Sequence, residues 1–273
     1  MATDSDRALA DLRATVERIG PLGVAVSGGV DSMTLSVVAH DVLGPDAEMY
    51  HAVSPAVPPS ATERVRRYAG SRGWRLEIVD AGETTDERYV ANPANRCYFC
   101  KTHLYAAMRD RTEVTLVSGT NLDDLGDYRP GLGAAAEHGV RHPYVETGVD
   151  KRTVRAISAR LGLDDLAELP AAPCLSSRIE TGIRIAPEML SAVDDCERMI
   201  VEALEPHTVR CRVRRGAIVV ELDEPSLGAL DDDARTTLGA AVAARFEGVP
   251  GAGPVRFESY RTGSAFLRAD ADG

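Results

Sequence analysis

The stretch LGVAVSGGVDSMTLSVVAH, residues 22–40, decides the fold of the first half of the chain. Residues 22–26 are apolar and predict a buried strand, and residues 31–43 predict an apolar helix. Gly28 and Gly29 stand between them, where glycine lets the backbone turn tightly and approach a ligand closely. Because N–H groups at a helix start attract anions, the stretch predicts either an anion-binding turn or a plain turn capped by Asp31.

Strands and helices alternate on both sides of this stretch. Further strands are expected at residues 49–53, 76–79 and 114–117, and further helices at residues 61–71, 97–109 and 151–161. Such alternation predicts an α/β fold, in which a parallel sheet carries helices on both faces.

The pattern changes after about residue 180. A helix, two strands, a helix and a strand are expected in that order, at residues 187–204, 209–213, 217–222, 227–246 and 255–260. This order predicts a smaller α+β domain. We therefore expect two domains, residues 1–180 and residues 181–273.

Composition and charge narrow the classes of function. The 273 residues are 44% hydrophobic and 27% charged, which is typical of a globular protein with a full-sized core. The 31 Lys and Arg residues against 42 Asp and Glu residues give a net charge of -11, which disfavours binding of nucleic acid over the whole surface. Neither a long apolar stretch nor a secretory signal is present, so we expect a cytoplasmic protein without nucleic-acid or membrane partners.

Lysine is rare in this chain. Lys101 and Lys151 are its only lysines, and every other basic residue is arginine. A GC-rich genome or an acidic, salt-adapted proteome would explain the bias, but arginine also binds phosphate or carboxylate through two parallel hydrogen bonds. Composition does not separate these explanations.

Residues 27–32, Ser-Gly-Gly-Val-Asp-Ser, match neither a Walker A loop nor the G-x-G-x-x-G dinucleotide pattern. They resemble the PP-loop of ATP pyrophosphatases, which have an adenine nucleotide alpha hydrolase-like fold. The resemblance implies that ATP binds at this loop and transfers AMP to a substrate oxygen with release of pyrophosphate. It assigns contacts with ATP to five residues: Ser27, Gly28, Gly29, Asp31 and Ser32.

A second loop, SGTNLDD at residues 118–124, follows a later strand. Open parallel sheets bind ligands at the carboxyl ends of their strands, so this loop is expected near the nucleotide. Asp31 and Asp123 are the candidate ligands of Mg²⁺, which prefers carboxylate oxygens. A solvated acidic turn is the alternative. The residues expected to contact the cofactor are Gly119, Asn121 and Asp124.

The chain has five cysteines, an odd number that argues against a disulfide framework in a cytoplasmic protein. Cys97 and Cys100 are three residues apart in an expected helix and therefore lie on one face, as a chelating pair would. The pair is typical of half a zinc site, a redox pair or part of an iron–sulfur site. A redox pair is disfavoured because no thioredoxin-like context surrounds it.

A third thiol, Cys174, lies in the sequence Pro-Cys-Leu-Ser-Ser-Arg. Arg178 and Arg184 follow it, and cationic neighbours favour the reactive thiolate form of a cysteine. A buried, inert cysteine is the alternative. Cys196 and Cys211, in an expected helix and an expected strand, are interpreted as structural.

Four motifs follow one another along the chain: SGGVDS, NPANRCYFCK, SGTNLDDLGDYRPG and PCLSSRIETG. Together they resemble the LarE family, the PP-loop sulfur transferases that help to build the nickel-pincer nucleotide of lactate racemase. The resemblance extends over residues 22–222.

This resemblance implies a two-step reaction. ATP with Mg²⁺ adenylylates a carboxylate of pyridinium-3,5-biscarboxylic acid mononucleotide, and sulfur then displaces AMP to leave a thiocarboxylate. In one type of LarE the motif cysteine, here Cys174, gives up its own sulfur. In the other type three cysteines hold a [4Fe–4S] cluster that carries an extra sulfide. Cys97, Cys100 and Cys174 match those three ligands, so the resemblance favours the cluster type.

The resemblance also assigns residues to the substrate. Arg210 and Arg212 fall in a segment like the family's R-x-R strand and would hold a substrate phosphate or a second carboxylate. Glu197 resembles an acidic position near that site. A charged outer strand face and a solvated helix face are the alternatives, and the register is open because Arg214 and Arg215 follow.

Further residues are expected near the ATP or the cluster: Arg178, Asp127, Tyr128 and Arg129. Family members assemble as homo-oligomers, so the resemblance implies a homo-oligomer as well as a small-molecule nucleotide substrate. The sulfide donor is not identified by the sequence.

Three other interpretations remain open. A PP-loop tRNA thiolase would act on a tRNA base, but the acidic net charge and the lack of a basic arm disfavour it. An amide-forming PP-loop enzyme would not require the three cysteines. A nucleotide-binding regulatory protein would hold a structural zinc ion through Cys97, Cys100, Cys174 and His103.

Overall fold

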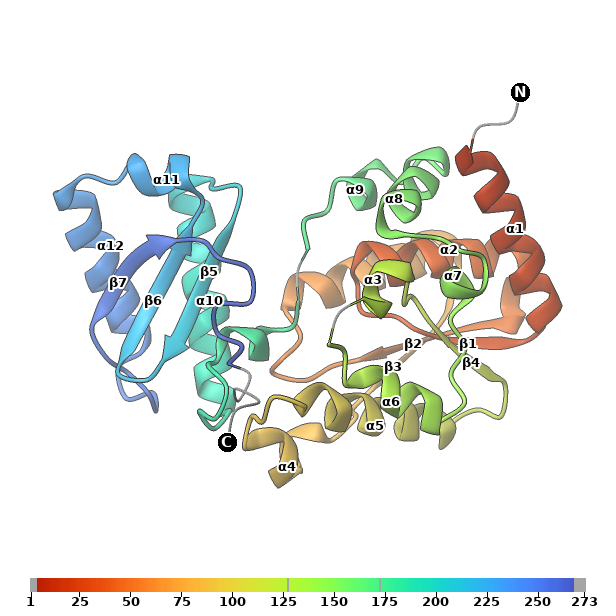
Figure 1. Cartoon of the computed structure of the whole chain (residues 1–273), viewed down its shortest axis with the longest axis horizontal. Helices are drawn as coiled ribbons and strands as arrows, with labels where there is room; N and C mark the ends of the chain where they lie inside the picture. The colour runs from red at the N-terminus through yellow and green to blue at the C-terminus, as the bar shows by residue number, and fades with distance from the viewer. Residues whose placement is uncertain (1–3, 127, 172, 268–273) are drawn as a thin grey trace. The chain divides into compact units, whose positions relative to one another are not determined.

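The computed structural model describes residues 4–126, 128–171 and 173–267 (Figure 1). Contacts between residues divide the chain into two compact units. The first unit comprises Met1–Glu83 and Cys97–Ala172, and the second comprises Thr84–Arg96 and Pro173–Gly273. This division differs from the boundary expected between residues 180 and 181.

A four-stranded parallel sheet forms the centre of the first unit, which confirms the expected α/β fold. Its strands are β1 (Leu22–Ala25), β2 (Ala47–Ala52), β3 (Arg75–Val79) and β4 (Thr115–Ser118), in the order β3-β2-β1-β4. Ala25 is in register with both Tyr50 and Ser118, so three strands end at the same edge. After β1 the chain adds β2 and β3 on one side of this strand, and it then adds β4 on the other side. α/β sheets bind ligands at the point where the strand order changes direction in this way.

Helices cover both faces of this sheet. One core is shared by α1 (Asp4–Ile19), α2 (Val30–Leu43), α3 (Pro59–Arg72), α8 (Lys151–Arg160) and α9 (Asp164–Ala167). The opposite core contains Leu104 and Met108 of α5 (Arg96–Arg109) and Ala135 of α6 (Gly131–Glu137). The remaining short helices of this part of the chain are η1 (Gly44–Asp46), η2 (Glu83–Thr85), η3 (Leu122–Leu125) and α7 (Pro143–Glu146).

Helix α1 was not expected from the sequence. Leu9, Leu12 and Val16 are buried, and spacings of three and four residues place them on one helix face. Charged residues separate them in the sequence, so the apolar stripe is visible only when the helical period is applied.

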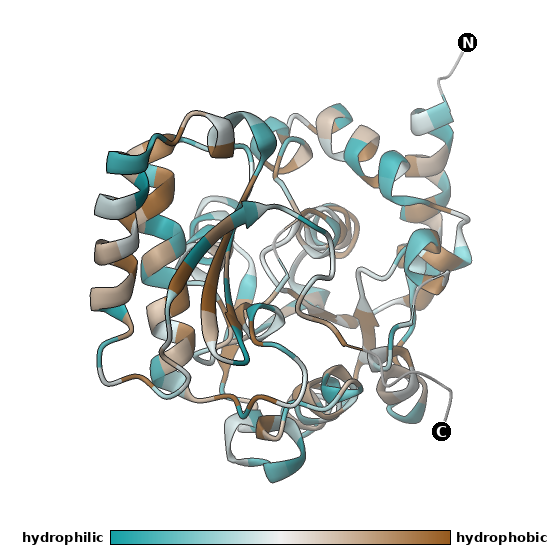
Figure 2. Ribbon diagram, turned by 60° about the vertical axis from the view of Figure 1, so that its left-hand side comes forward, coloured by the Kyte–Doolittle hydropathy of each residue, from teal (hydrophilic) through white to brown (hydrophobic). Residues whose placement is uncertain are grey.

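The second unit is built on a three-stranded mixed sheet. β5 (Val209–Arg214) pairs antiparallel with β6 (Ala217–Leu222), and β7 (Val255–Ser259) pairs parallel with β6. All residues of β6, the central strand, are buried. Helix α10 (Pro187–Leu204) contributes its apolar residues to this core, and the distribution of apolar residues along the strands can be followed in Figure 2.

Two shorter helices replace the single helix expected at residues 227–246. They are α11 (Glu224–Gly228) and α12 (Asp232–Arg245). The Asp231 side chain accepts a hydrogen bond from the Ala234 N–H at 2.8 Å and so caps the start of α12. The expectation was therefore wrong, because an aspartate inside an apolar pattern acts as a helix start.

Residues 84–96, which include α4 (Glu87–Val90), pack in the second unit and not in the first. The buried Asn92 amide donates hydrogen bonds to the carbonyl groups of Glu180 and Ile183 at 2.9 and 3.0 Å. The Tyr89 hydroxyl lies 2.7 Å from Ser176 Oγ in η4 (Leu175–Arg178). These contacts hold the turn after Cys174 in the second unit.

Among the described residues, no helix combines the length and the apolar character that are needed to cross a membrane.

Candidate functional site

The loop between β1 and α2 is the centre of the candidate nucleotide site. Gly28 has a φ of +82°, and a Cβ atom there would lie 2.8 Å from the carbonyl oxygen of Ala61. Gly29 precedes α2, and no side chain of the described structure caps the start of this helix. The first N–H groups of α2 are therefore available to an anion, an arrangement that suits phosphate groups.

Two serines determine the shape of this loop. Ser32 Oγ accepts a hydrogen bond from the Ser27 N–H at 3.0 Å and donates one to the Gly29 carbonyl at 3.2 Å. The hydroxyl oxygens of Ser27 and Ser32 are 3.0 Å apart. Ser32 is buried and braces the loop from inside. The contacts of both hydroxyl groups with ATP stay a prediction.

The second loop packs on the first, as expected from the ends of β1 and β4. A Cβ atom at Gly119 would lie 2.8 Å from the backbone nitrogen of Ser32. Asn121 caps η3 together with Asp124, and its side-chain amide donates to Asp31 Oδ1 at 3.2 Å. The two glycine-containing loops thus meet at one edge of the sheet.

Lys151 belongs to this edge, although it was not assigned to the site from the sequence. Its ammonium group pairs with the Asp31 carboxylate, and its backbone N–H donates to Asp123 Oδ2 at 2.9 Å. The hydroxyl group of buried Tyr144 donates to the Asp31 carbonyl at 3.0 Å. Lys151 therefore joins the two carboxylates that were expected to hold Mg²⁺. The signal that could have found it is the rarity of lysine in the chain.

The carboxylates of this edge fit a nucleotide-bound Mg²⁺ ion. Such an ion is usually held by one or two carboxylates and by phosphate oxygens, and Asp31 and Asp123 supply that number. Asp124 instead accepts a hydrogen bond from the Asn121 N–H at 3.1 Å and pairs with Arg129 at 2.7 Å. Within either unit, the described residues contain no group of three or more His, Cys, Asp or Glu side chains suited to a metal ion.

Asp127 lies outside the described residues. Its neighbour Tyr128 is half exposed, and Arg129 is partly exposed beside Asp124. The expected role of this segment near the ATP stays a prediction.

Cys97 and Cys100 lie in the first turn of α5, as expected. Cys97 is exposed and Cys100 is partly buried. The hydroxyl group of Tyr98, between them, donates to Glu137 of α6 at 2.7 Å and holds this turn against the neighbouring helix. The pair belongs to the first unit and Cys174 to the second, so the three-cysteine cluster stays a prediction.

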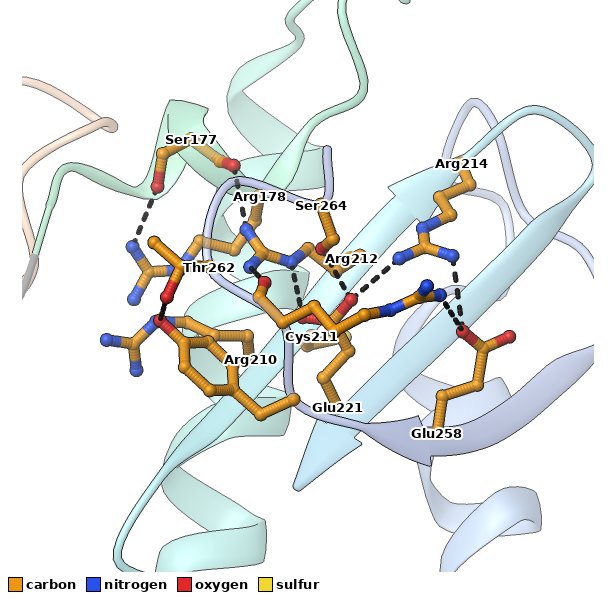
Figure 3. A network of polar contacts seen from close by, with 12 residues as sticks. Ser177, Arg178, Arg210, Cys211, Arg212, Arg214, Glu221, Glu258, Thr262 and Ser264 are labelled. Atoms are coloured by element: carbon orange, nitrogen blue, oxygen red, sulfur yellow. Dashed lines mark hydrogen bonds and ion pairs between the residues drawn. The ribbon is translucent and has the colours of Figure 1, made fainter. Parts of the chain in front are cut away.

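Arg178 anchors the turn that carries Cys174. Its contact with the Ser177 side chain is drawn in Figure 3. Its Nε and Nη2 donate to the two oxygens of Glu197 at 2.9 Å each, and its Nη1 donates to the carbonyl groups of Pro173 and Cys174 at 2.5 and 3.2 Å. Arg178 is only 2% exposed. Its contacts therefore position the Cys174 turn, and the expected contact of Arg178 with the cofactor stays a prediction.

The surroundings of Cys174 differ from the cationic ones expected. Cys174 itself is exposed, so it is not the buried, inert cysteine of the alternative interpretation. Glu197 neutralises Arg178, and Glu87 forms an exposed ion pair with Arg184. Glu197 also accepts a hydrogen bond from the Cys211 N–H at 2.9 Å. Glu197 is therefore an internal anchor and not part of a solvated helix face.

Arg212 is buried in a second ion-pair network. Its Nε donates to Glu221 Oε2 at 3.0 Å, and its Nη1 donates to the Ser177 carbonyl at 3.1 Å (Figure 3). Glu221 has no exposed surface and also pairs with Arg214 at 2.6 Å. Arg210, Arg212 and Arg214 alternate along β5 and so share one face, which resolves the register left open by the sequence. Arg212 thus stabilises the fold through these contacts, and a direct contact of Arg212 with the substrate stays a prediction.

Arg210 is more accessible than Arg212 on this strand face. It is half buried, and its guanidinium carbon lies 5.9 Å from the centre of the Tyr260 ring. Burial lowers the pKa of Arg210, and the nearby positive charge of Arg178 lowers it further. A basic side chain in this environment would gain from an anionic partner.

Cys196 and Cys211 have no exposed surface. A hydrogen bond to Cys196 and burial together raise the pKa of Cys211 well above its ordinary value. Their expected structural role fits these surroundings. The five cysteines, all within the described part of the chain, form no disulfide.

The fold and the site define an α/β protein with a PP-loop fold. No protein-family model matches the chain. An uncharacterized protein of Synechocystis, slr1717, is 40% identical over 203 residues, which cover 73% of this chain and 75% of that protein. The chain belongs to the same family as this cyanobacterial protein.

Two more distant relatives cover similar lengths. The pyridinium-3,5-bisthiocarboxylic acid mononucleotide synthase of Lactiplantibacillus plantarum is 28% identical over 224 residues, 80% of each chain. The uncharacterized protein MJ0830 of Methanocaldococcus jannaschii is 23% identical over 205 residues, 74% of this chain and 77% of that protein. The similarity to the synthase supports membership of the LarE family and the assignment of the chain as an enzyme.

Proposed function

We propose that the chain is an ATP-dependent sulfur transferase of nickel-pincer nucleotide biosynthesis. Its substrate is pyridinium-3,5-biscarboxylic acid mononucleotide, and its product carries a thiocarboxylate. The observation that carries the proposal is the meeting of the SGGVDS loop with Gly119, Asn121 and Lys151 at one sheet edge. The 28% identity to the pyridinium-3,5-bisthiocarboxylic acid mononucleotide synthase supports the same reaction class.

In the first step a substrate carboxylate oxygen attacks the α-phosphorus of ATP. The bond from that phosphorus to the bridging oxygen breaks, and pyrophosphate leaves. The N–H groups at the start of α2 hold the pyrophosphate end. Asp31 and Asp123 would hold a Mg²⁺ ion, which would offset phosphate charge. The ammonium group of Lys151, which pairs with Asp31 in this structure, would contact the phosphates when ATP is bound.

In the second step sulfide attacks the acyl carbon and AMP leaves, so the carboxylate becomes a thiocarboxylate. A carboxylate is a poor electrophile until AMP becomes its leaving group. Arg210 holds the substrate phosphate or the second carboxylate through charge-assisted hydrogen bonds. Arg178 and Glu197 keep the Cys174 turn in place, and Arg212 holds the same turn through the Ser177 carbonyl.

A [4Fe–4S] cluster held by Cys97, Cys100 and Cys174 would supply the sulfide. The chemistry of the donors fits, because three thiols leave one coordination position without a protein ligand. Iron and acid-labile sulfide are measured after anaerobic reconstitution of the wild type and of Cys97→Ser. The proposal predicts about four of each per chain in the wild type and loss of both in the variant.

Pyrophosphate release tests the adenylylation step. The wild type is incubated with ATP and Mg²⁺, with and without the pyridinium biscarboxylate nucleotide. Release that depends on this substrate supports the proposal. Release that depends instead on tRNA would support a tRNA thiolase, and unchanged activity of the triple variant Cys97→Ser, Cys100→Ser, Cys174→Ser would support an amide-forming enzyme.

A small-molecule substrate is consistent with the similarity to the synthase. We also propose a homo-oligomeric assembly and a cytoplasmic location, and light scattering of the purified chain tests the assembly.

A further inference from the structure

Arg64 on α3 reaches the loop that connects β1 with α2. Its Nη1 donates a hydrogen bond to the Gly28 carbonyl oxygen at 2.8 Å. The two residues are 36 positions apart in the sequence, and neither composition nor motif marks Arg64 as a site residue. The contact is made by the same turn of α3 whose Ala61 leaves no room for a Cβ atom at Gly28.

The contact sets the direction of the next backbone N–H. The chain has no cis peptide bonds among its described residues, so the carbonyl of Gly28 and the N–H of Gly29 point in opposite directions. Because Arg64 holds the carbonyl toward α3, the Gly29 N–H is turned to the other side of the loop. That N–H reaches Ser27 Oγ only at 3.4 Å, a long contact that leaves it available to a stronger acceptor.

A second carbonyl of the loop is held from the same side. His51 Nδ1 lies 2.8 Å from the Val26 carbonyl oxygen, which can only accept, so Nδ1 carries the proton. His51 Nε2 then accepts from the hydroxyl group of Thr62, on α3, at 2.9 Å. Burial lowers the pKa of His51 and favours this neutral form. His51 of β2 thus anchors the Val26–Ser27 peptide group, and Arg64 of α3 anchors the Gly28–Gly29 peptide group.

Arg64 forms no direct ion pair within the described structure, and the negative charge of Asp165 acts on it only at longer range. No carboxylate of a described residue lies within 4.0 Å of its guanidinium group, whereas its neighbour Arg67 pairs with Asp165 at 2.7 Å. Burial lowers the pKa of Arg64, and the charge of Arg67 adds to this effect. A hollow of about 340 Å³ adjoins the guanidinium group and is lined by Ser60, Glu63, Arg64 and Arg67.

We propose that Arg64 is a positioning residue for the phosphate groups of ATP. It orients the Gly28–Gly29 peptide so that the Gly29 N–H faces the anion, and its positive charge raises the affinity of the same loop for phosphate. This inference rests on the proposed function only in that the loop binds the pyrophosphate part of ATP.

Calorimetric titration with Mg²⁺-pyrophosphate and Mg²⁺-ATP tests the proposal without any sulfur transfer. Arg64→Met removes the charge and the donor, whereas Arg64→Gln keeps an N–H donor and removes the charge. Arg66→Met is the matched control, because Arg66 is an exposed arginine of the same helix. We expect Arg64→Met to raise the Kd for both ligands about ten- to a hundred-fold, the range of a lost charge-assisted hydrogen bond.

Arg64→Gln is expected to fall between Arg64→Met and the wild type, and Arg66→Met is expected to bind like the wild type. In steady-state assays the Arg64 variants should raise the KM for ATP with little change in kcat. Equal Kd values for the wild type and both Arg64 variants would overturn the inference. If the wild type itself binds neither ligand, the proposed function fails as well, so the two failures are distinguishable. Arg64→Gln keeps the test valid if Arg64→Met does not fold.

Discussion

Arg178 positions the turn that carries Cys174 through contacts with its backbone. It is enclosed between Glu197 and the backbone of Pro173 and Cys174. The desolvation of both charges is offset only while the pair is complete. The turn that presents Cys174 therefore depends on a buried ion pair on the neighbouring helix.

Removing one partner of this pair leaves the other charge buried. We expect Arg178→Met to lower the free energy of unfolding by about 3–5 kcal/mol in urea denaturation. The double variant Arg178→Met, Glu197→Leu should recover part of the loss, because no unpaired charge remains. Arg184→Met, which removes the exposed pair with Glu87, is the control and should leave stability nearly unchanged. Equal effects of Arg178→Met and Arg184→Met would contradict the interpretation.

The proposed role of Lys151 also depends on the charge of its side chain. In the proposed function its compact ammonium group acts as a point charge for phosphate, a role for which the planar guanidinium group of arginine is not equivalent. We expect Lys151→Met and Lys151→Arg both to reduce kcat for pyrophosphate release by about a hundred-fold or more. Arg152→Met, the exposed neighbour, should keep the wild-type rate. Wild-type turnover in Lys151→Arg would show that the residue only balances the charge of Asp31.

The SGGVDS loop and the SGTNLDD loop could be assigned from the sequence. In each, a serine and a glycine directly follow a strand that the apolar pattern predicts. Lys151 could not be assigned in this way, because it lies 120 positions from Asp31 and only the fold brings them together. The same holds for Arg212, since the sequence shows a charged strand but not its buried partner Glu221. Local patterns thus predicted the nucleotide loop, whereas side-chain pairing across elements required the structure.

The close packing of the loop after β4 on the first turn of α2 explains why Gly119 stands at the start of the second loop. A Cβ atom at this position would meet the backbone of Ser32 and Asp31 at 2.8 and 2.9 Å, and backbone cannot move aside easily. The two loops must separate to admit any side chain.

We therefore expect Gly119→Ala to destabilise the chain by about 1–3 kcal/mol and to weaken the binding of ATP. Gly126→Ala is the matched control, because a Cβ atom there would find its nearest neighbour at 3.7 Å and the φ of Gly126 is -79°. Thermal unfolding and calorimetric titration with ATP check both variants. A Gly119→Ala variant with the ATP affinity of the wild type would contradict the packing argument.

Strands and long helices could be predicted where the periodic spacing of apolar residues was uninterrupted. The prediction of one helix at 227–246 was wrong because Asp231 caps a new helix inside the same apolar pattern. Helix α1 was missed because charged residues separate its buried leucines and valine in the sequence. Local capping and charge interruptions, more than propensity, set these boundaries.

The stability of the whole molecule should depend on pH through the buried His51 and the partly buried His142. Burial lowers the pKa of His51 and of His142 from the ordinary value of 6.5. The unfolded chain therefore binds more protons below about 6.5, so the stability supplied by the neutral forms is present above this pH and is lost as pH falls through it.

Urea unfolding at about pH 7.5 and about pH 5.5 measures this dependence. We expect the wild type to lose stability at the lower pH and His51→Gln to lose less. A pH dependence that is identical in the wild type and His51→Gln would contradict the assignment of a neutral, buried His51.

The division of the molecule into two units was only partly visible in the sequence. The change from an alternating pattern to an α+β pattern predicted two domains, but the segment 84–96 returns to the second unit through Asn92 and Tyr89. Hydrogen bonds between a side-chain amide and distant carbonyl groups leave no periodic pattern in the sequence. A segment that packs in another unit through such contacts therefore cannot be recognised from local patterns.

Transfer of sulfur to a carboxylate is the central claim, and the mass of the product tests it most directly. The reconstituted chain is incubated anaerobically with ATP, Mg²⁺, sulfide and the pyridinium biscarboxylate nucleotide, and the nucleotide is analysed by mass spectrometry. The account predicts replacement of a carboxylate oxygen by sulfur, dependent on ATP, in several-fold excess over the chain and with Cys174 unmodified. Pyrophosphate release without any sulfur-containing nucleotide would contradict it.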